Sequence, residues 1–152
     1  MITVHHLNNS RSQRILWLLE ELNVKYEIRH YQRDVITNRA PDELKVIHPL
    51  GKSPVIEDGN LIIAETGAII EYLLNKYDKN QLLPNKKDEE YNDYLHFLHF
   101  AEGSAMLPLL LSLFNGFLGK AGAPLEPLTE SLKLSFIRVN PTFVNATLYS
   151  SI

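Results

Sequence analysis

The 152-residue sequence contains no cysteine, which excludes a disulfide framework, a thiolate metal site and a cysteine nucleophile. Strong charge of either sign is also missing: the formal net charge is -3, so no electrostatic footprint for nucleic acid is present. No uninterrupted apolar run reaches the roughly 18 to 20 residues that span a bilayer, and the N-terminus lacks a signal-peptide pattern. We therefore expect a cytoplasmic protein that binds neither nucleic acid nor membrane.

Strand and helix patterns alternate through the first half of the chain. Period-two alternation indicates strands, and apolar residues at helical spacing indicate helices. Ser10 and Gln13 fit a capping box, which predicts that the first long helix begins at Ser10. The expected order of strand, helix, strand, helix, strand, strand, helix covers residues 2–6, 10–22, 26–31, 41–47, 55–57, 61–63 and 65–77. This order predicts a compact α/β domain, a βαβ unit followed by a ββα unit, over residues 1–78.

The second half of the chain has a different character. Residues 79–87 are rich in Lys, Asn and Pro and are predicted to be a linker. Residues 88–114 carry apolar side chains near helical spacing, and Pro108 is expected to break or kink that helix. From about residue 120 no helical stripe is visible. We therefore expect residues 88–152 to begin as helix and to end in an atypical tail.

Two segments of the α/β domain suit an extended peptide that carries an amino-acid head group. Ser53-Pro54 lies between a turn and a strand, where a cis-proline would direct the preceding backbone N–H and C=O towards a ligand. Twelve residues later, Glu65 and Thr66 open a helix, whose free N–H groups and positive end favour a carboxylate. The Glu65 carboxylate would meet the ligand's ammonium group.

These segments resemble the glutathione site of the glutathione S-transferase family. The similar stretches are His48–Val55 and Ala64–Ile69, and Arg14–Leu22 is similar to the family's first helix. The resemblance covers roughly residues 2–114. It implies a thioredoxin-like N-terminal domain, a homodimer, a role in detoxification, and glutathione as co-substrate beside a small hydrophobic electrophile. Because the family's second domain is all helical and longer, the resemblance also implies that residues 88–152 form an incomplete all-α domain, as in a truncated, frame-shifted or divergent short form. No metal is expected, because adjacent strand residues His5 and His6 point to opposite faces.

The resemblance also assigns roles to individual residues. Ser53 and a cis Pro54 would pair with the cysteinyl backbone of glutathione, and Glu65 with Thr66 would hold its γ-glutamyl head. The glycine carboxylate would face two cations, Lys52 and Arg39.

The group that activates the thiol is open among three residues. The thiol must ionise before it attacks, and a donor at the start of the first helix stabilises the thiolate. The family's catalytic position falls on Asn9, with Ser10 one residue and Ser12 three residues further on. Asn9 departs from the family's usual Ser, Cys or Tyr. A simple helix cap for Ser10 and a simple turn residue for Asn9 remain as structural alternatives.

The sequence therefore predicts an enzyme, a glutathione transferase that attacks an electrophilic or disulfide substrate with the glutathione thiolate. Two other hypotheses stay open at this point. One is a non-enzymatic glutathione-binding or interaction module. The other is an inactive truncated fragment.

Overall fold

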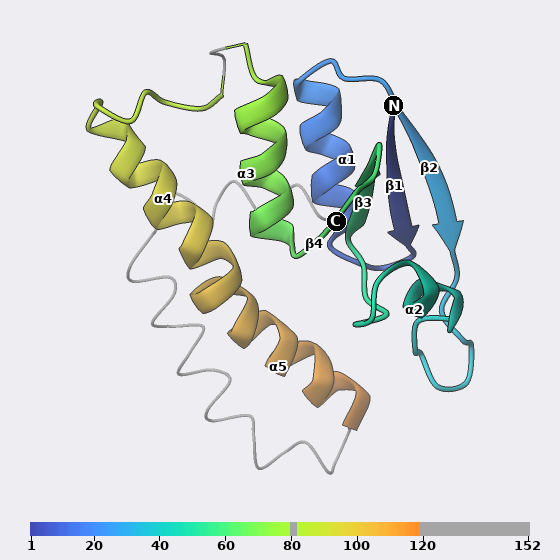
Figure 1. The fold of residues 1–152 in the computed structure, drawn as a ribbon. Coiled ribbons are helices and arrows are strands. Elements are labelled where there is room, and N and C mark those ends of the chain that lie inside the picture. The colour runs from blue at the N-terminus through green and yellow to red at the C-terminus, as the bar shows by residue number, and fades with distance from the viewer. Residues whose placement is uncertain (80–81, 119–152) are drawn as a thin grey trace. The chain divides into compact units, whose positions relative to one another are not determined.

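The computed structural model describes residues 1–79 and 82–118 (Figure 1). The chain divides into two compact units, Met1–Tyr94 and Leu95–Ile152. This division lies beyond the predicted linker, and the predicted domain bounds remain predictions. The predicted atypical tail lies outside the described residues.

A four-stranded sheet in the order β2-β1-β3-β4 forms the centre of the first unit. Strands β1 and β2 pair in parallel, whereas β1 with β3 and β3 with β4 pair antiparallel. The hairpin between β3 and β4 turns through Gly59, which has a φ of 63° that suits glycine. The strands are β1 (Ile2–Leu7), β2 (Tyr26–Tyr31), β3 (Val55–Asp58) and β4 (Leu61–Ala64). This βαβ–ββα arrangement confirms the predicted thioredoxin-like fold.

Two helices, α1 (Ser12–Glu21) and α3 (Thr66–Tyr77), contact each other and the sheet (Figure 1). They bury the apolar stripes that the helical spacing predicts, because alternate strand residues present one apolar face to them. Each fully buried Leu or Ile side chain contributes about 1.5–3 kcal/mol of burial free energy. The buried cluster consists of Ile2, Val4, Ile15, Leu19, Leu22, Ile56, Ile69, Leu73 and Leu74.

The predictions for the first two helices are wrong at their starts. Helix α1 begins at Ser12, its N-cap is Arg11, and no side chain caps it, so the capping box at Ser10 does not form. Asn9 has a left-handed φ of 51°, and the turn that it belongs to continues through Ser10, where helix was expected. Helix α2 covers Glu43–Ile47, two residues later than the predicted start at Pro41.

The long helix after the linker is interrupted near Pro108. Helices α4 (Glu90–Phe100) and α5 (Met106–Leu118) are joined by a π-helical segment, η1 (Ala101–Ala105). The N–H of Met106 donates to the carbonyl of Ala101, five residues earlier. Since proline lacks an N–H and crowds the preceding turn, a wider turn just before Pro108 accommodates its ring. The irregularity expected at Pro108 is therefore a π bulge on its N-terminal side.

The helical stretch Glu90–Gly116 is long and apolar enough to cross a membrane by length and composition, with a mean hydropathy of 1.5. This stretch contains no long uninterrupted apolar run, because polar and charged side chains are spaced along it, but its overall composition is apolar. Core helices of soluble proteins meet the same criterion, so this property by itself does not place the chain in a membrane.

Candidate functional site

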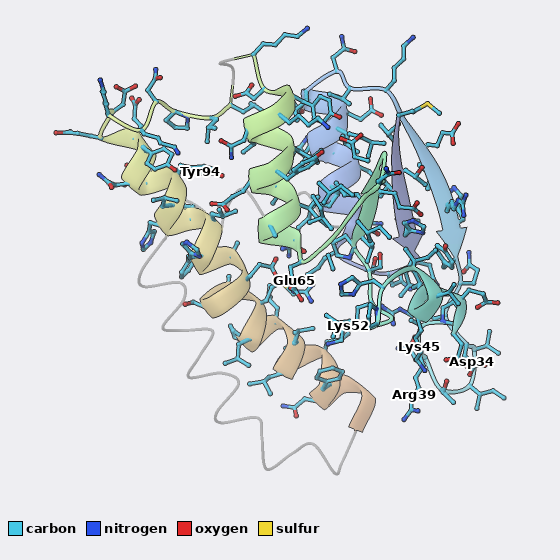
Figure 2. The ribbon with its side chains drawn as sticks, in the orientation of Figure 1. Asp34, Arg39, Lys45, Lys52, Glu65 and Tyr94 are labelled. Atoms are coloured by element: carbon cyan, nitrogen blue, oxygen red, sulfur yellow. The ribbon has the colours of Figure 1, made fainter. Side chains whose placement is uncertain are left out.

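A pocket forms where the segment before β3 meets the start of α3. Five of the six residues predicted to contact glutathione line it, namely Lys52, Ser53, Pro54, Glu65 and Thr66. The Ser53–Pro54 peptide bond is cis. Figure 2 shows Glu65 at the start of α3 and Lys52 in the segment before β3. The structure thus brings together the two segments that the sequence singled out.

Arg39, the sixth predicted contact, is not among the residues that line this pocket. It lies on the loop between β2 and α2, and its side chain is exposed. The backbone of this loop is closed on itself, because Asp34 N–H donates to the Arg39 carbonyl at 2.9 Å. Of the two cations expected to face the glycine carboxylate, Lys52 lines the described pocket and Arg39 does not.

The backbone at Glu65 is unusual for a residue with a side chain. It has a φ of 74° and a ψ of 126°, a sparsely populated conformation that costs about 1–3 kcal/mol. Its carbonyl accepts the Ile69 N–H at 3.0 Å, which closes the first turn of α3. The Glu65 side chain is exposed at the pocket. This geometry presents the carboxylate beside the free N–H groups of the helix end.

Thr66, the first residue of α3, contributes a buried hydroxyl. The residue is 3% exposed, and among the described residues its Oγ1 has no hydrogen-bond partner. A buried polar group without a partner costs about 1–3 kcal/mol. A ligand group that bonds Oγ1 would remove this cost, which makes the atom a candidate ligand contact.

Four pocket residues were not predicted as contacts: Arg11, His48, Leu50 and Ala64. His48 accepts the Leu50 N–H through Nδ1 at 3.3 Å and the Gly51 N–H through its carbonyl at 2.8 Å. Gly51 has a φ of 57°, and a Cβ there would approach Lys45 Cγ to 2.6 Å. Glycine at this position therefore allows the turn that leads into Lys52. The turn was recognisable in the sequence, but the place of the imidazole at the pocket was not.

A chain of hydroxyl groups lies next to the pocket, behind Ser53. Ser53 Oγ donates to the His5 carbonyl at 2.8 Å and accepts from Ser10 Oγ at 3.3 Å. Ser10 Oγ and Ser12 Oγ are 2.7 Å apart, and Ser12 Oγ is 2.8 Å from His6 Nδ1. The structure thus bonds one of the three candidates for thiol activation, Ser10, to a pocket residue, and bonds a second, Ser12, to Ser10.

The three candidates differ in exposure. Ser12 is fully buried, Ser10 is half-buried, and Asn9 is exposed. Asn9 takes part through its backbone, because its carbonyl accepts from Arg33 Nη2 at 3.3 Å. Of the three side chains, only that of Ser10 is both half-buried and bonded to a pocket residue.

Arg33 holds the loop that carries these candidates, a role that the sequence analysis missed. Its Nε donates to the Asn8 carbonyl at 3.1 Å, and Nη1 donates to the Asn38 carbonyl at 3.1 Å. The Arg33 N–H also donates to Asn8 Oδ1 at 2.8 Å. One guanidinium therefore joins the loop after β1 to the loop after β2. Backbone carbonyls leave no signature in a sequence, so no pattern pointed to this clamp.

The two neighbouring histidines of β1 have different surroundings. His5 is fully buried, with Nε2 2.7 Å from Glu57 Oε1 and Nδ1 2.9 Å from the Tyr31 hydroxyl. His6 is half-buried, and burial, together with the nearby His30, lowers its pKa. Within residues 1–79 and 82–118, no group of three or more His, Asp or Glu side chains is placed to hold a metal ion.

The fold and the pocket together define a thioredoxin-like domain followed by helices. The family model described as "Glutathione S-transferase, N-terminal domain" matches residues 1–75. "Glutathione S-transferase 1" of Saccharomyces cerevisiae is 38% identical over 130 residues, which cover 82% of this chain and 55% of that protein. A crystal structure of a glutathione S-transferase from Actinobacillus pleuropneumoniae is 39% identical, with a TM-score of 0.79, over 93% of this chain and 66% of that one. The chain therefore belongs to the glutathione S-transferase family.

A more distant structure shares the fold. It is a glutathione transferase homolog from Lodderomyces elongisporus, 23% identical with a TM-score of 0.70, over 91% of this chain and 72% of that one. Its crystals contained two glutathione molecules per subunit. This chain spans about half the length of the curated relatives that it matches, 55% and 43% for two of them.

Proposed function

We propose that this chain binds glutathione in the pocket between the Ser53 segment and the start of α3, and activates its thiol. The thiolate attacks a small hydrophobic electrophile or a disulfide, which makes the protein a glutathione transferase. The observation that carries the proposal is that one pocket contains the Glu65 carboxylate, the N-terminus of α3 and the unpartnered hydroxyl of Thr66. An amino acid head group carries both the ammonium and the carboxylate that these groups bind.

The remaining contacts follow from the same pocket. The backbone of Ser53 pairs with the cysteinyl part of glutathione, in the manner of an added strand. Lys52, rather than Arg39, faces the glycine carboxylate, because Lys52 lines the pocket. Ser10 donates to the thiolate sulfur, since it is half-buried and bonded to Ser53, whereas Ser12 is fully buried.

Wider properties of the family belong to the same proposal. We propose that the protein acts in the cytoplasm, in detoxification, as a homodimer. The relatives named glutathione S-transferase support the activity, while assembly and location rest on the resemblance alone.

A second function, glutathione binding without turnover, is favoured by one observation. Asn9, the position at which the family resemblance places a thiol-activating Ser, Cys or Tyr, has an exposed side chain and uses its carbonyl to accept from Arg33. If Ser10 serves only the hydroxyl network and not the sulfur, glutathione binds without activation of its thiol.

Calorimetry with glutathione, followed by turnover of an aryl halide, tests both functions. Glu65→Gln is expected to weaken glutathione binding about tenfold or more, because it removes a charge-assisted partner of the ammonium. Glu71→Gln is the matched control, since Glu71 is exposed on the same helix and does not line the pocket. Binding with turnover supports the transferase, and binding without turnover supports the second function. Absence of binding, or equal effects of the two variants, contradicts the assigned site.

A further inference from the structure

In the hydroxyl chain beside the pocket, the direction in which the hydrogen bonds are donated depends on whether His6, at one end, donates or accepts. It runs from His6 on β1 through Ser12 and Ser10 at the start of α1 to Ser53 before β3, with successive separations of 2.8, 2.7 and 3.3 Å. Each serine has a single hydroxyl hydrogen to donate. Ser53 gives its hydrogen to the His5 carbonyl at 2.8 Å, so Ser53 can only accept from Ser10.

Counting hydrogens leaves two arrangements for the rest of the chain. In one, His6 Nδ1 donates to Ser12, Ser12 donates to Ser10, and the hydrogen of Ser10 points towards the pocket side. In the other, Nδ1 carries no hydrogen, Ser12 donates to it, and Ser10 donates to Ser12. Ser10 then presents only lone pairs outward, and these repel a thiolate.

The described contacts favour the first arrangement. Ser10 Oγ donates to Ser53 Oγ, and it also accepts the Ser12 backbone N–H at 3.3 Å. Ser12 is fully buried, so water does not supply it with an alternative partner. The direction chosen at His6 is therefore carried through Ser12 to Ser10.

Resting on the proposed function, we propose that His6 is a positioning residue whose Nδ1–H, acting through Ser12, keeps the Ser10 hydroxyl hydrogen off Ser12, so that it turns from Ser53 Oγ to the glutathione sulfur when glutathione binds. His6 does not touch the substrate in this scheme, and no proton is transferred along the chain. The imidazole supplies a donor at one end, and Ser10 delivers a hydrogen bond to the thiolate at the other.

The surroundings of His6 fit this role. Burial and His30 lower the pKa of His6, which keeps the imidazole neutral at neutral pH with its hydrogen on one of the two ring nitrogens. The described partners of His6 are Ser12 on α1 and His30 on β2, whose ring packs edge-on at 5.6 Å. His30 is the described titratable group that faces His6. When the thiolate of glutathione lies at the other end of the hydroxyl chain, the tautomer with its hydrogen on Nδ1 is favoured, because only this tautomer leaves the Ser10 hydrogen for the sulfur.

The test measures the thiolate fraction of bound glutathione by its ultraviolet absorbance across a pH series. His6→Asp replaces the donor with an acceptor and is expected to lower the thiolate fraction about tenfold at a pH below the thiol pKa, because Ser10 loses its outward hydrogen. Asn8→Asp is the control, since it adds the same charge two residues from His6 at a position whose described bonds go to Arg33 and Tyr31 and not to Ser12. His6→Asn, whose amide can donate, is expected to restore the fraction.

A double variant separates the effect of hydrogen-bond direction along the hydroxyl chain from the effect of the added negative charge. In a Ser12→Ala background the hydroxyl chain is interrupted, so the excess effect of His6→Asp over Asn8→Asp is expected to vanish. The proposal is overturned if the two aspartate variants act equally, or if the excess persists without Ser12. Nitrogen NMR of the unaltered protein with bound glutathione gives an independent check, and an Nδ1 without hydrogen overturns the proposal even where the variants do not fold.

Binding of S-methylglutathione, measured for every variant, separates failure of this proposal from failure of the proposed function. A wild-type protein that does not bind glutathione or holds it fully as thiol contradicts the function. A wild-type thiolate that is insensitive to the donor at position 6 contradicts the role of His6 alone.

Discussion

Replacing Asp58 by asparagine tests how a single carboxylate joins the hairpin to α3. Asp58 ends β3, and its Oδ2 accepts from Lys76 Nζ at 2.7 Å, from the Tyr72 hydroxyl at 2.8 Å and from the Tyr77 hydroxyl. The Asp58 side chain is only 10% exposed. All three donors lie on α3, so the carboxylate fastens the second half of that helix to the sheet.

The magnitude follows from the pKa of Asp58. Hydrogen bonds from Lys76 and Tyr77 lower this pKa from 3.8 to about 2. Because the folded-state pKa is lowered, the stabilisation is fully present above the unfolded pKa and is lost as pH falls through about 2. A difference of this size corresponds to about 2 kcal/mol at neutral pH. Asp58→Asn should therefore lower the free energy of unfolding by about 2 kcal/mol and flatten its pH dependence between about pH 4 and pH 2.

Urea unfolding followed by tryptophan fluorescence measures this effect in the first compact unit, Met1–Tyr94, which contains Asp58. Trp17 is the only tryptophan of the chain and lies on α1, so it reports on the first unit. Asp42→Asn is the matched control: its carboxylate is also 2.7 Å from a lysine nitrogen, that of Lys45, but its side chain is 88% exposed. Solvent screens such a pair, so little change is expected. Equal losses in the two variants, or an unflattened pH curve for Asp58→Asn, would refute the reasoning.

Three further comparisons use urea unfolding, the first together with calorimetry, and a fourth compares turnover with glutathione affinity. Thr66→Val should raise stability by about 1 kcal/mol, because it removes an unpartnered buried hydroxyl, while calorimetry should show weaker glutathione binding. Glu65→Gly should be more stable than Glu65→Ala by about 1 kcal/mol, since only glycine relieves the φ of 74°. Gly51→Ala should lose about 1 kcal/mol or more, whereas Gly67→Ala, which has open space for a Cβ, should not. Arg33→Lys should lower turnover of an aryl halide more than glutathione affinity, because an ammonium cannot span the carbonyls that the guanidinium joins.

The sheet and its main helices were predictable because their signals are local. Alternation along residues 26–31 gave the bounds of β2, and Asp58-Gly59 located the hairpin. The start of α1 was not predictable in this way, although Ser10 and Gln13 fit the capping pattern. The Ser10 hydroxyl instead bonds Ser53, 43 residues away, and Ser12, so long-range partners compete with the cap. A local rule cannot weigh a partner that only the tertiary fold supplies.

The candidate site shows the same division. Two short motifs identified five residues that line the pocket, because each motif lies within one segment. Arg33 was missed because its partners are backbone carbonyls of Asn8, Asn9 and Asn38, which any residue type would provide. Arg39 was expected from its charge alone, and charge without a position does not define a contact.

The positions with a left-handed backbone show why the start of α3 stands apart. Among the described residues other than glycine, positive φ occurs at Asn9, Asn23, Asn38 and Glu65. Asparagine tolerates this region well, whereas glutamate does not. Glu65 therefore bears a backbone cost beside a second cost, the unpartnered Thr66 hydroxyl, and both lie at one pocket. A folded chain keeps such costs where they serve a site, since the same φ aims the Glu65 carboxylate and the free N–H groups of α3 at one space.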